Sequence, residues 1–486
     1  MPGLSPLDFL YLCSTVGRAY KSRRPLHLAH VISALPPYPS DHMATLFLTA
    51  GLVLLNGMLF GFSTASIAGV VGTISEAFAL STRATEMMVT SLLVGCFVGA
   101  VLAAPISQRI GRRPSCLLAA TLAFAGYALV PLGQAMAPGV GMLVAARILI
   151  GLGVGLSSMV VPMYAAEVTP ARHRGAVVSL FQLAVTIGIL LGYAVPLALT
   201  GHARWDQMLG GGVLIAAACA GAVLLLPESP RWLLSRGRMA EGEAAARRLG
   251  LAGEISMGEG ESAPAGNWRA VLGRGSTRAV LILCSVLFVL QNFSGIDGIL
   301  YYAPHIFTEL GFPAGVAALA ATFGLGLVNV LATMAAMMLV DRLGRRPLLI
   351  AGSAAMAVSL AVVIGAALAD WPYVALAGLC AYIVAFALSL GPLPYVLMSE
   401  LFPSAIRERG IAAASATSWL FNAIVAASFL SVVEGIGLAA TIGIFLVVCV
   451  ASLFISLAYV PETRQKELED IETDVLAGKA LRHLGA

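Results

Sequence analysis

Twelve separate runs of apolar residues, each long enough to cross a lipid bilayer, constrain this chain more than any other feature of its sequence. A helix needs about 20 apolar residues to span the hydrocarbon core. Hydrophobic residues make up 59% of the 486 residues and charged residues 11%, against roughly 25% charged residues in soluble domains. The sequence therefore predicts an all-α polytopic membrane protein. The expected spans cover approximately residues 44–72, 86–108, 114–134, 138–163, 175–200, 207–227, 279–308, 315–340, 347–369, 372–399, 410–433 and 437–460.

The Lys and Arg residues fall almost entirely on one side of these spans. With the N-terminus placed inside, only Arg83 and Arg204 fall outside, and Arg147 lies within a span. Cytoplasmic loops carry an excess of Lys and Arg. We therefore expect a multi-pass protein with both termini in the cytoplasm, most simply in the plasma membrane. Because topology accounts for the positive charge, no nucleic-acid partner is expected.

The chain divides into two predicted halves, residues 44–228 and 279–461, joined by a cytoplasmic linker at 229–278. Ser229 and Pro230 suit the start of a short helix in this linker. A tail at 1–43 precedes the first half, and we favour a true start at Met43 over a long cytoplasmic tail. A second tail, 462–486, is expected in the cytoplasm.

Three motifs occur twice at nearly the same spacing. Gln108–Pro114 recurs as Asp341–Pro347, 233 residues later, and the stretch from Glu167 recurs from Glu400, again after 233 residues. Pro227-Glu-Ser is echoed by Pro461-Glu-Thr after 234 residues. The two halves are therefore repeats in parallel register, a plan in which the substrate site lies near the midplane between them.

These motifs resemble those of the sugar porter family of the major facilitator superfamily, over about residues 44–470. The resemblance implies the twelve-helix major facilitator fold and alternating-access transport of a neutral hexose or pentose, with no enzymatic activity, cofactor or metal. The motifs that carry it are the loops Gly111-Arg-Arg-Pro114 and Gly344-Arg-Arg-Pro347, Arg147–Gly155, Pro162–Glu167, Pro227–Trp232, Gln291–Asp297, Gly391–Pro394 and Pro461–Arg464.

Acids and arginines stand at matching helix ends in both halves, where positive-inside topology alone would require no acids. The resemblance implies an interhelical network that clasps the halves on the inside when the site faces out. Losing one partner of a partly buried pair is costly, so such a network can act as a switch. Its expected members are Arg112, Arg113, Glu167, Arg174, Glu228, Asp341, Arg345, Arg346, Glu400, Arg407 and Glu462.

Amide side chains inside the spans are candidates for sugar binding. An amide both donates and accepts hydrogen bonds without carrying a charge that the membrane makes expensive. The resemblance places Gln182, Gln291, Asn292, Asn329 and Asn422 at sugar-binding positions. Trp419 is three residues before Asn422 and can share its helix face, where its ring offers an apolar wall for a sugar. A helix–helix hydrogen bond is the alternative role of each amide.

Departures from the family pattern bear on substrate and coupling. Asn292 and Asp297 replace a Gln and an Asn of the seventh-helix motif, and Tyr395 stands where the family commonly has Trp. Proton-coupled members usually carry an Asp in the first helix, near the arginine that corresponds to Arg147, but this chain has Ser63. We therefore expect facilitated diffusion rather than proton symport. Asp297 keeps symport open, because a carboxyl inside the membrane can carry a proton.

Other classes of function fit the sequence less well. No Walker loop, zinc-protease motif or catalytic triad pattern is present, which argues against an ATP-driven pump or a membrane enzyme. A polyol or inositol symporter is a further alternative to a sugar facilitator. A non-transporting sugar sensor is less expected, because the tail after Thr463 is short.

Overall fold

The structure is a computed structural model that describes residues 40–484 except 137–138, 252–272, 274, 404–405, 465 and 467. The chain divides into two units, residues 1–44 and 45–486. The predicted tail at 1–43 lies almost wholly outside the described residues. The fold below is that of the second unit.

Twelve helical segments in the described residues are long and apolar enough to cross a membrane, which confirms the predicted number of spans. Three of them are built from two helices each: Trp205–Leu225, Gly275–Tyr301 and Pro372–Leu401. The segments comprise α3 (Ser40–Ala65), α5 (Thr82–Ile110), α6 (Arg112–Met136), α7 (Val140–Val168), α8 (Ala171–Leu199), α9 (Trp205–Gly210) with α10 (Gly212–Leu225), α14 (Gly275–Phe293) with α15 (Ile296–Tyr301), α17 (Val316–Leu343), α18 (Arg345–Leu368), α19 (Pro372–Leu388) with α20 (Leu393–Leu401), α21 (Arg407–Ile436) and α22 (Leu438–Tyr459).

Apart from the breaks within the sixth and tenth spans, two predicted spans differ from the observed helices. The sequence predicts that the first span reaches residue 72, but α3 ends at Ala65 and a separate short helix, α4 (Val71–Ala77), follows a turn. It predicts that the seventh continues to residue 308, but the chain breaks into α14, α15 and α16 (Ala303–Glu309). Further short helices lie outside the spans: α11 (Pro230–Ser235), α12 (Met239–Leu249), α23 (Leu468–Leu476) and the 3-10 helix η1 (Leu481–His483).

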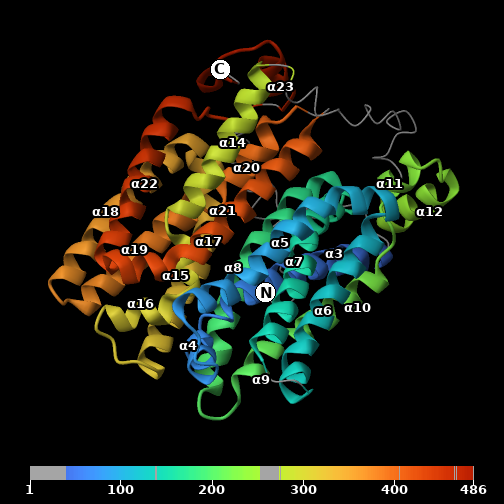
Figure 1. The fold of residues 1–486 in the computed structure, drawn as a ribbon. Coiled ribbons are helices and arrows are strands. Elements are labelled where there is room, and N and C mark those ends of the chain that lie inside the picture. Colours follow the sequence, from blue (N-terminus) through green and yellow to red (C-terminus); the bar gives the residue numbers. More distant parts are fainter. Residues whose placement is uncertain are drawn as a thin grey trace, which may run out of the picture. The chain divides into compact units, whose positions relative to one another are not determined.

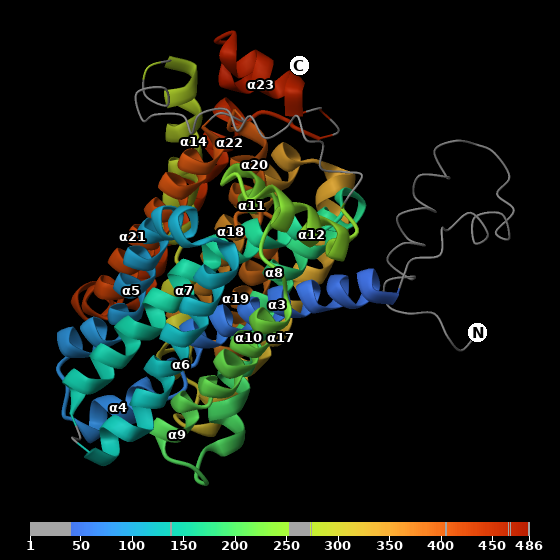
Figure 2. The same cartoon turned by 90° about the vertical axis from the view of Figure 1, so that its right-hand side faces the viewer.

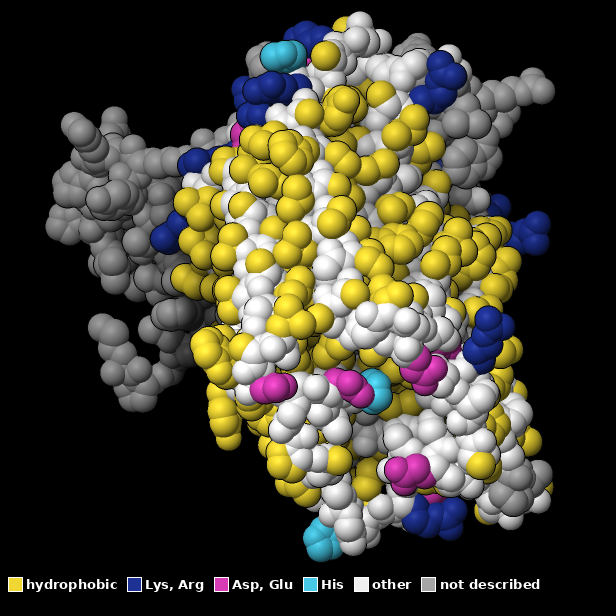
Figure 3. Space-filling model, turned by 60° about the vertical axis from the view of Figure 1, so that its left-hand side comes forward, with side chains coloured by type: hydrophobic (Ala, Val, Ile, Leu, Met, Phe, Trp, Pro, Cys, Tyr) yellow, Lys and Arg dark blue, Asp and Glu magenta, His cyan; other side chains and the backbone are white. Residues whose placement is uncertain are grey.

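The surface between the helix ends is apolar. Figure 3 shows one face on which hydrophobic side chains cover the middle, while Lys and Arg gather above them. Large apolar side chains such as Val358, Phe454 and Leu214 are 64–75% exposed. A contiguous exposed apolar surface of this kind suits contact with lipid.

Helices pack closely where glycines face a neighbouring backbone. A Cβ added at Gly95 or Gly99 of α5 would lie 2.3 or 2.4 Å from a carbonyl oxygen of α7, and Gly151 and Gly155 of α7 meet α5 in the same way. The first half also touches the second, since α5 packs on α21 and α8 on α17. Figure 1 and Figure 2 show α5 beside α21 from two directions.

Candidate functional site

The seventh span is broken at the point where its predicted site residues lie. Gln291 and Asn292 are in the last turn of α14, and Asp297 is in the first turn of α15. Between them Gly295 has a φ of +97°, and a Cβ there would lie 2.2 Å from the ring of Phe445. Glycine is therefore required for this break, which separates the last turn of α14 from the first turn of α15. Broken membrane helices of this kind form the binding sites of many transporters.

We expect Gly295→Ala to destabilise the protein more than Gly311→Ala. Both glycines have positive φ, +97° and +94°, but of the two only Gly311 has open space where the alanine Cβ would lie. Each alanine costs about 1–3 kcal/mol of backbone strain, and at Gly295 overpacking adds about 1–3 kcal/mol. Thermal unfolding of the purified variants checks this expectation. Equal losses of thermal stability in both variants would show that the close approach to Phe445 adds nothing to the cost of the alanine.

The two amides of α14 reach neighbouring helices of the second half. Gln291 Nε2 donates to the carbonyl oxygen of Gly391 over 2.9 Å, at the break between α19 and α20. Asn292 Nδ2 donates to Phe288 in its own helix at 2.6 Å and to Ser418 Oγ of α21 at 3.3 Å. Both side chains are buried, and their amide oxygens remain acceptors that a sugar hydroxyl can use.

Asp297 lies in a polar cluster with Tyr301 and Asn422. The Tyr301 hydroxyl donates to Asn422 Oδ1 over 3.1 Å, and both side chains lie beside the Asp297 carboxyl. Its Oδ2 is buried without a hydrogen-bond partner among the described residues. A buried acceptor left unpaired is costly, so this carboxyl suits a bound hydroxyl or a proton.

Aromatic side chains from both halves meet beside these polar groups. Trp419 of α21 packs against Phe60 of α3 with 5.2 Å between ring centroids, and Phe60 also contacts Phe181 of α8. The Tyr395 ring packs edge-on against Phe288 at 4.8 Å, and its side chain lies next to Ser418. Trp419 is therefore placed to form an apolar wall between the halves.

Gln182 and Asn329 lie on α8 and α17, one of the pairs of helices that pack against each other across the halves. Gln182 follows Phe181 on α8 and is half-buried, and Asn329 on α17 is 7% exposed. α8 and α17 are in contact. Gln182 is thus contributed by the first half and Asn329 by the second, on two helices that are in contact.

Arg147 is held by the backbone of a neighbouring helix. Its Nε donates to the carbonyl oxygen of Met88 at 3.0 Å and its Nη2 to that of Val89 at 3.1 Å. The side chain is 2% exposed. Ser63 in turn pairs with the Tyr127 hydroxyl over 2.6 Å. Tyr127 lies 64 residues away in sequence, and no motif in the sequence indicated this pair.

Charged residues of the predicted network lie at one end of the helices, with one ion pair in each half. Arg112 pairs with Glu167 at 3.1 Å in the first half, and Arg345 pairs with Glu400 at 3.0 Å in the second. Hydroxyls that the sequence did not indicate join each acid: Ser229 donates to Glu167 and Thr463 to Glu400. We call this end of the helices the charged end and the other the opposite end.

Two further acids accept from the first turns of helices. Glu228 Oε1 accepts from the backbone N–H groups of Arg112 and Arg113 at 3.0 and 3.1 Å. Glu462 accepts from those of Arg345 and Arg346 at 3.1 and 3.2 Å. A carboxylate at a helix N-terminus is favourable because it meets unpaired N–H groups and the positive end of the helix dipole.

The remaining arginines of the network bind backbone carbonyls. Arg113 donates to Val223 and Leu224, Arg346 to Leu457, and Arg407 to Phe402. The side chains of Arg174 and Asp341 lie outside the described part of the structure. Each of these charged-end contacts stays within one half or joins a half to the segment that directly follows it in the chain.

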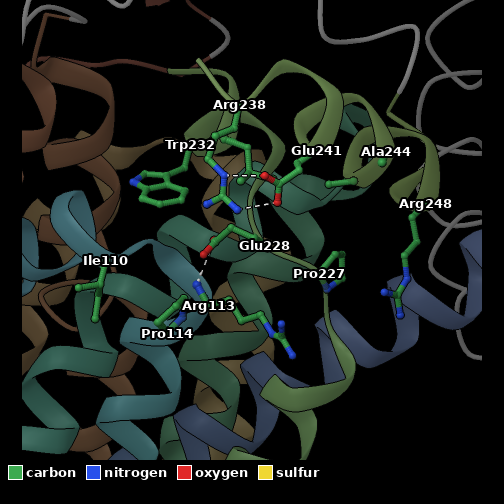
Figure 4. Close-up of a pocket in the computed structure, with 12 residues that line it drawn as sticks. Ile110, Arg113, Pro114, Pro227, Glu228, Trp232, Arg238, Glu241, Ala244 and Arg248 are labelled. Carbon is green, nitrogen blue, oxygen red and sulfur yellow. Dashed lines mark hydrogen bonds and ion pairs between the residues drawn. The ribbon is translucent and has the colours of Figure 1, made fainter. Parts of the chain in front are cut away.

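A cavity of about 500 Å³ lies at the charged end, between the start of α6 and the linker helices α11 and α12. Figure 4 shows Glu228 beside Arg113, and Arg238 bonded to Glu241 among the residues that line the cavity. Hydrogen bonds from Arg238 hold the pKa of exposed Glu241 below its ordinary value. None of the predicted sugar-binding residues lines this cavity, which belongs to the packing of the linker on the first half.

Comparison with known proteins agrees with this architecture. Residues 49–475 match the family Sugar (and other) transporter. The Galactose-proton symporter of Escherichia coli (strain K12) is 36% identical over 457 residues, which cover 92% of this chain and 98% of that protein. The Arabinose-proton symporter of the same strain is 33% identical, and the match covers 88% of this chain and 93% of that protein.

A solved structure of the xylose transporter XylE from E. coli, in a partially occluded inward-open conformation, is also similar. It has a TM-score of 0.76 and 32% sequence identity, and the match covers 87% of this chain and 100% of that chain. The fold and its repeated halves define a multi-pass membrane transporter of the major facilitator type. The chain belongs to the sugar porters, the Sugar (and other) transporter family, and is a transporter rather than an enzyme.

Proposed function

We propose that this protein carries a neutral sugar across the membrane by alternating access, with proton coupling. The observation that carries this proposal is the set of polar side chains at the broken seventh span: two amides at the end of α14 that bond neighbouring segments, and a carboxyl with an unpaired oxygen at the start of α15. The names of its relatives, symporters of galactose and of arabinose with protons, support both the class of cargo and the coupling.

The chemistry of the interior suits a polyhydroxylated, uncharged solute. Amides supply matched donors and acceptors, and Trp419 supplies a flat apolar face. Arg147, which lies within a span, is already bonded to two carbonyls, and this disfavours an acidic cargo. The proposed sugar-binding residues are Gln182, Gln291, Asn292, Asp297, Asn329, Tyr395, Trp419 and Asn422.

Asp297 is the proposed proton carrier. It is the carboxyl of the polar cluster, so a proton on Asp297 would change the hydrogen bonds that Tyr301 and Asn422 offer to the sugar. If protonation of Asp297 changes the affinity for sugar, then sugar binding changes the affinity of Asp297 for its proton by the same factor, and the two binding events are coupled. This assignment replaces the first-helix Asp of the family pattern, which is Ser63 here.

Facilitated diffusion is the second candidate, and the first-helix site favours it. Ser63 does not titrate near neutral pH and is bonded to Tyr127, while Arg147 is satisfied by backbone carbonyls. The first-helix position therefore offers no titratable group beside Arg147 that could carry a proton.

Several features follow from the proposed function. We propose that the charged end faces the cytoplasm, with both termini there, because Lys and Arg gather at cytoplasmic ends, and that the plasma membrane is the site of action. Residues 44–228 and 279–461 would be the two moving halves and 229–278 the linker that braces them. The charge network would act as a gate between them.

Uptake into proteoliposomes tests the proposal. Labelled galactose, xylose, arabinose and glucose are offered with an inward proton gradient, with the gradient collapsed by an ionophore, and to empty liposomes. We expect accumulation of at least one sugar above equilibrium only with the gradient. Equilibration at a gradient-independent rate would instead establish a facilitator. Transport confined to polyols or inositol would contradict the sugar assignment, and saturable binding without any flux would indicate a sensor.

A further inference from the structure

A buried carboxylate joins the two halves at the opposite end of the helices. Glu86, in the second turn of α5, is 2% exposed. Its Oε1 accepts from the backbone N–H of Ser431 at 2.8 Å and its Oε2 from the Ser431 hydroxyl at 2.6 Å. Ser431 lies near the end of α21, so the contact connects the first half to the second. Neither residue belongs to a motif that is repeated between the halves.

Two neighbouring contacts join the halves at the same end. The Thr82 hydroxyl, one turn before Glu86, donates to the Glu434 carboxylate of α21. The Tyr193 hydroxyl of α8 donates to the carbonyl oxygen of Leu300 in α15 over 2.8 Å. The ion pairs of the charged end, in contrast, are made within single halves. The structure is therefore closed at the opposite end.

Burial makes the Glu86 contact dependent on conformation. A carboxylate removed from water is costly unless donors replace its hydration, and hydrogen bonds to a charged acceptor are about twice as strong as neutral ones. Ser431 supplies two such donors only while α5 and α21 stay together at this end. Once they separate, water takes over both roles. The contact thus stabilises one access state and is lost in the other.

We propose that Glu86 and Ser431 form a latch that keeps the opposite end closed and so sets the balance between the two access states. The inference rests on the proposed alternating-access function and extends it, because it names the residues that hold the closed end. Removal of the Glu86 carboxylate is expected to favour the state in which this end is open.

Hydrogen–deuterium exchange of the protein in lipid nanodiscs, without sugar, measures this balance directly. We expect Glu86→Ala to speed exchange in residues 82–93 and 426–436 and to slow it at the charged ends of the same helices. The expected change in the ratio of the two states is about tenfold, with a smaller shift for Ser431→Ala, which keeps the backbone donor. Glu76→Ala is the matched control, because Glu76 is an exposed acid at the same end whose side chain enters none of these contacts.

Unchanged exchange, or faster exchange at both ends, would overturn the latch. The second pattern is that of a loosened fold, whereas a shift between states moves the two ends in opposite directions. This measurement needs no transport, so it separates failure of the latch from failure of the sugar assignment.

A cross-link tests whether the latch must open. Glu86→Cys combined with Ser431→Cys is oxidised with copper phenanthroline, and the disulfide is verified by mass spectrometry. We expect transport to stop in the cross-linked protein and to return after reduction, while each single cysteine variant is insensitive to the oxidant. Undiminished transport by a verified cross-linked sample would contradict the proposal.

Discussion

Asp297→Asn is expected to abolish gradient-driven accumulation of sugar while sugar exchange across the membrane continues. Asn retains the size of the side chain and can still bond Tyr301 or Asn422, but it cannot release or accept a proton near neutral pH. A symporter that loses its proton site equilibrates its cargo and no longer concentrates it. We expect accumulation to fall to the level seen without a gradient, with exchange reduced by no more than about tenfold if one hydrogen bond is weakened.

Two assays on the same liposomes separate these effects. The first is uptake driven by an inward proton gradient, and the second is exchange of labelled for unlabelled sugar at equal pH. Ser63→Asp in the Asp297→Asn background asks whether a carboxyl at the first-helix position restores accumulation. Accumulation by Asp297→Asn at the level of the unchanged protein would contradict the assignment of Asp297.

Glu400→Ala is expected to slow transport about tenfold or more and to favour the state that is open at the charged end. The Arg345 and Glu400 side chains are only 12% and 17% exposed, and removal of one partner from a largely buried pair leaves the other charge uncompensated. If the charged ends of the two halves meet when the site faces outward, the uncompensated charge destabilises mainly the outward-facing state. Transport rates and the exchange measurement described for Glu86 report the two effects.

Glu167→Ala provides the matched comparison in the first half, because Arg112 and Glu167 repeat the same pair at 3.1 Å. Similar losses in both variants would show that each half contributes one set of contacts to the gate. Glu86→Ala added to Glu400→Ala is expected to move the equilibrium back, since the two changes weaken opposite ends. Transport and access equilibrium unaltered by Glu400→Ala would contradict the gating role.

Much of the architecture could be predicted from the sequence, because each span is long and the repeats fix their pairing. Spacing along the chain placed Arg112 with Glu167 and Arg345 with Glu400 at the same helix ends. The breaks could not be placed in this way, since an apolar run continues through Gly295 and hydrophobicity does not record a positive φ. Contacts between distant segments, such as Ser63 with Tyr127, need the fold itself.

Glu86 shows a different limit of what a sequence can indicate. An acid at the edge of an apolar run looks like an ordinary helix end in water, and its burial is evident only once α21 lies beside α5. Amides, rather than acids, are the side chains that indicate sugar binding within a span, so Glu86 carries no signal of that kind. Its partner Ser431 carries none either, because serine is common in membrane helices that pack together.

The glycine contacts between α5 and α7 limit how this protein can move. With backbones touching at Gly95, Gly99, Gly151 and Gly155, neither helix can slide or turn against the other without collision. Relative movement of the helices is then expected at the two contacts between the halves, α5 with α21 and α8 with α17. Within the first half, α5 and α7 therefore move together, and the hydrogen bonds that Thr82 and Glu86 of α5 make with α21 act on this pair of helices as one unit.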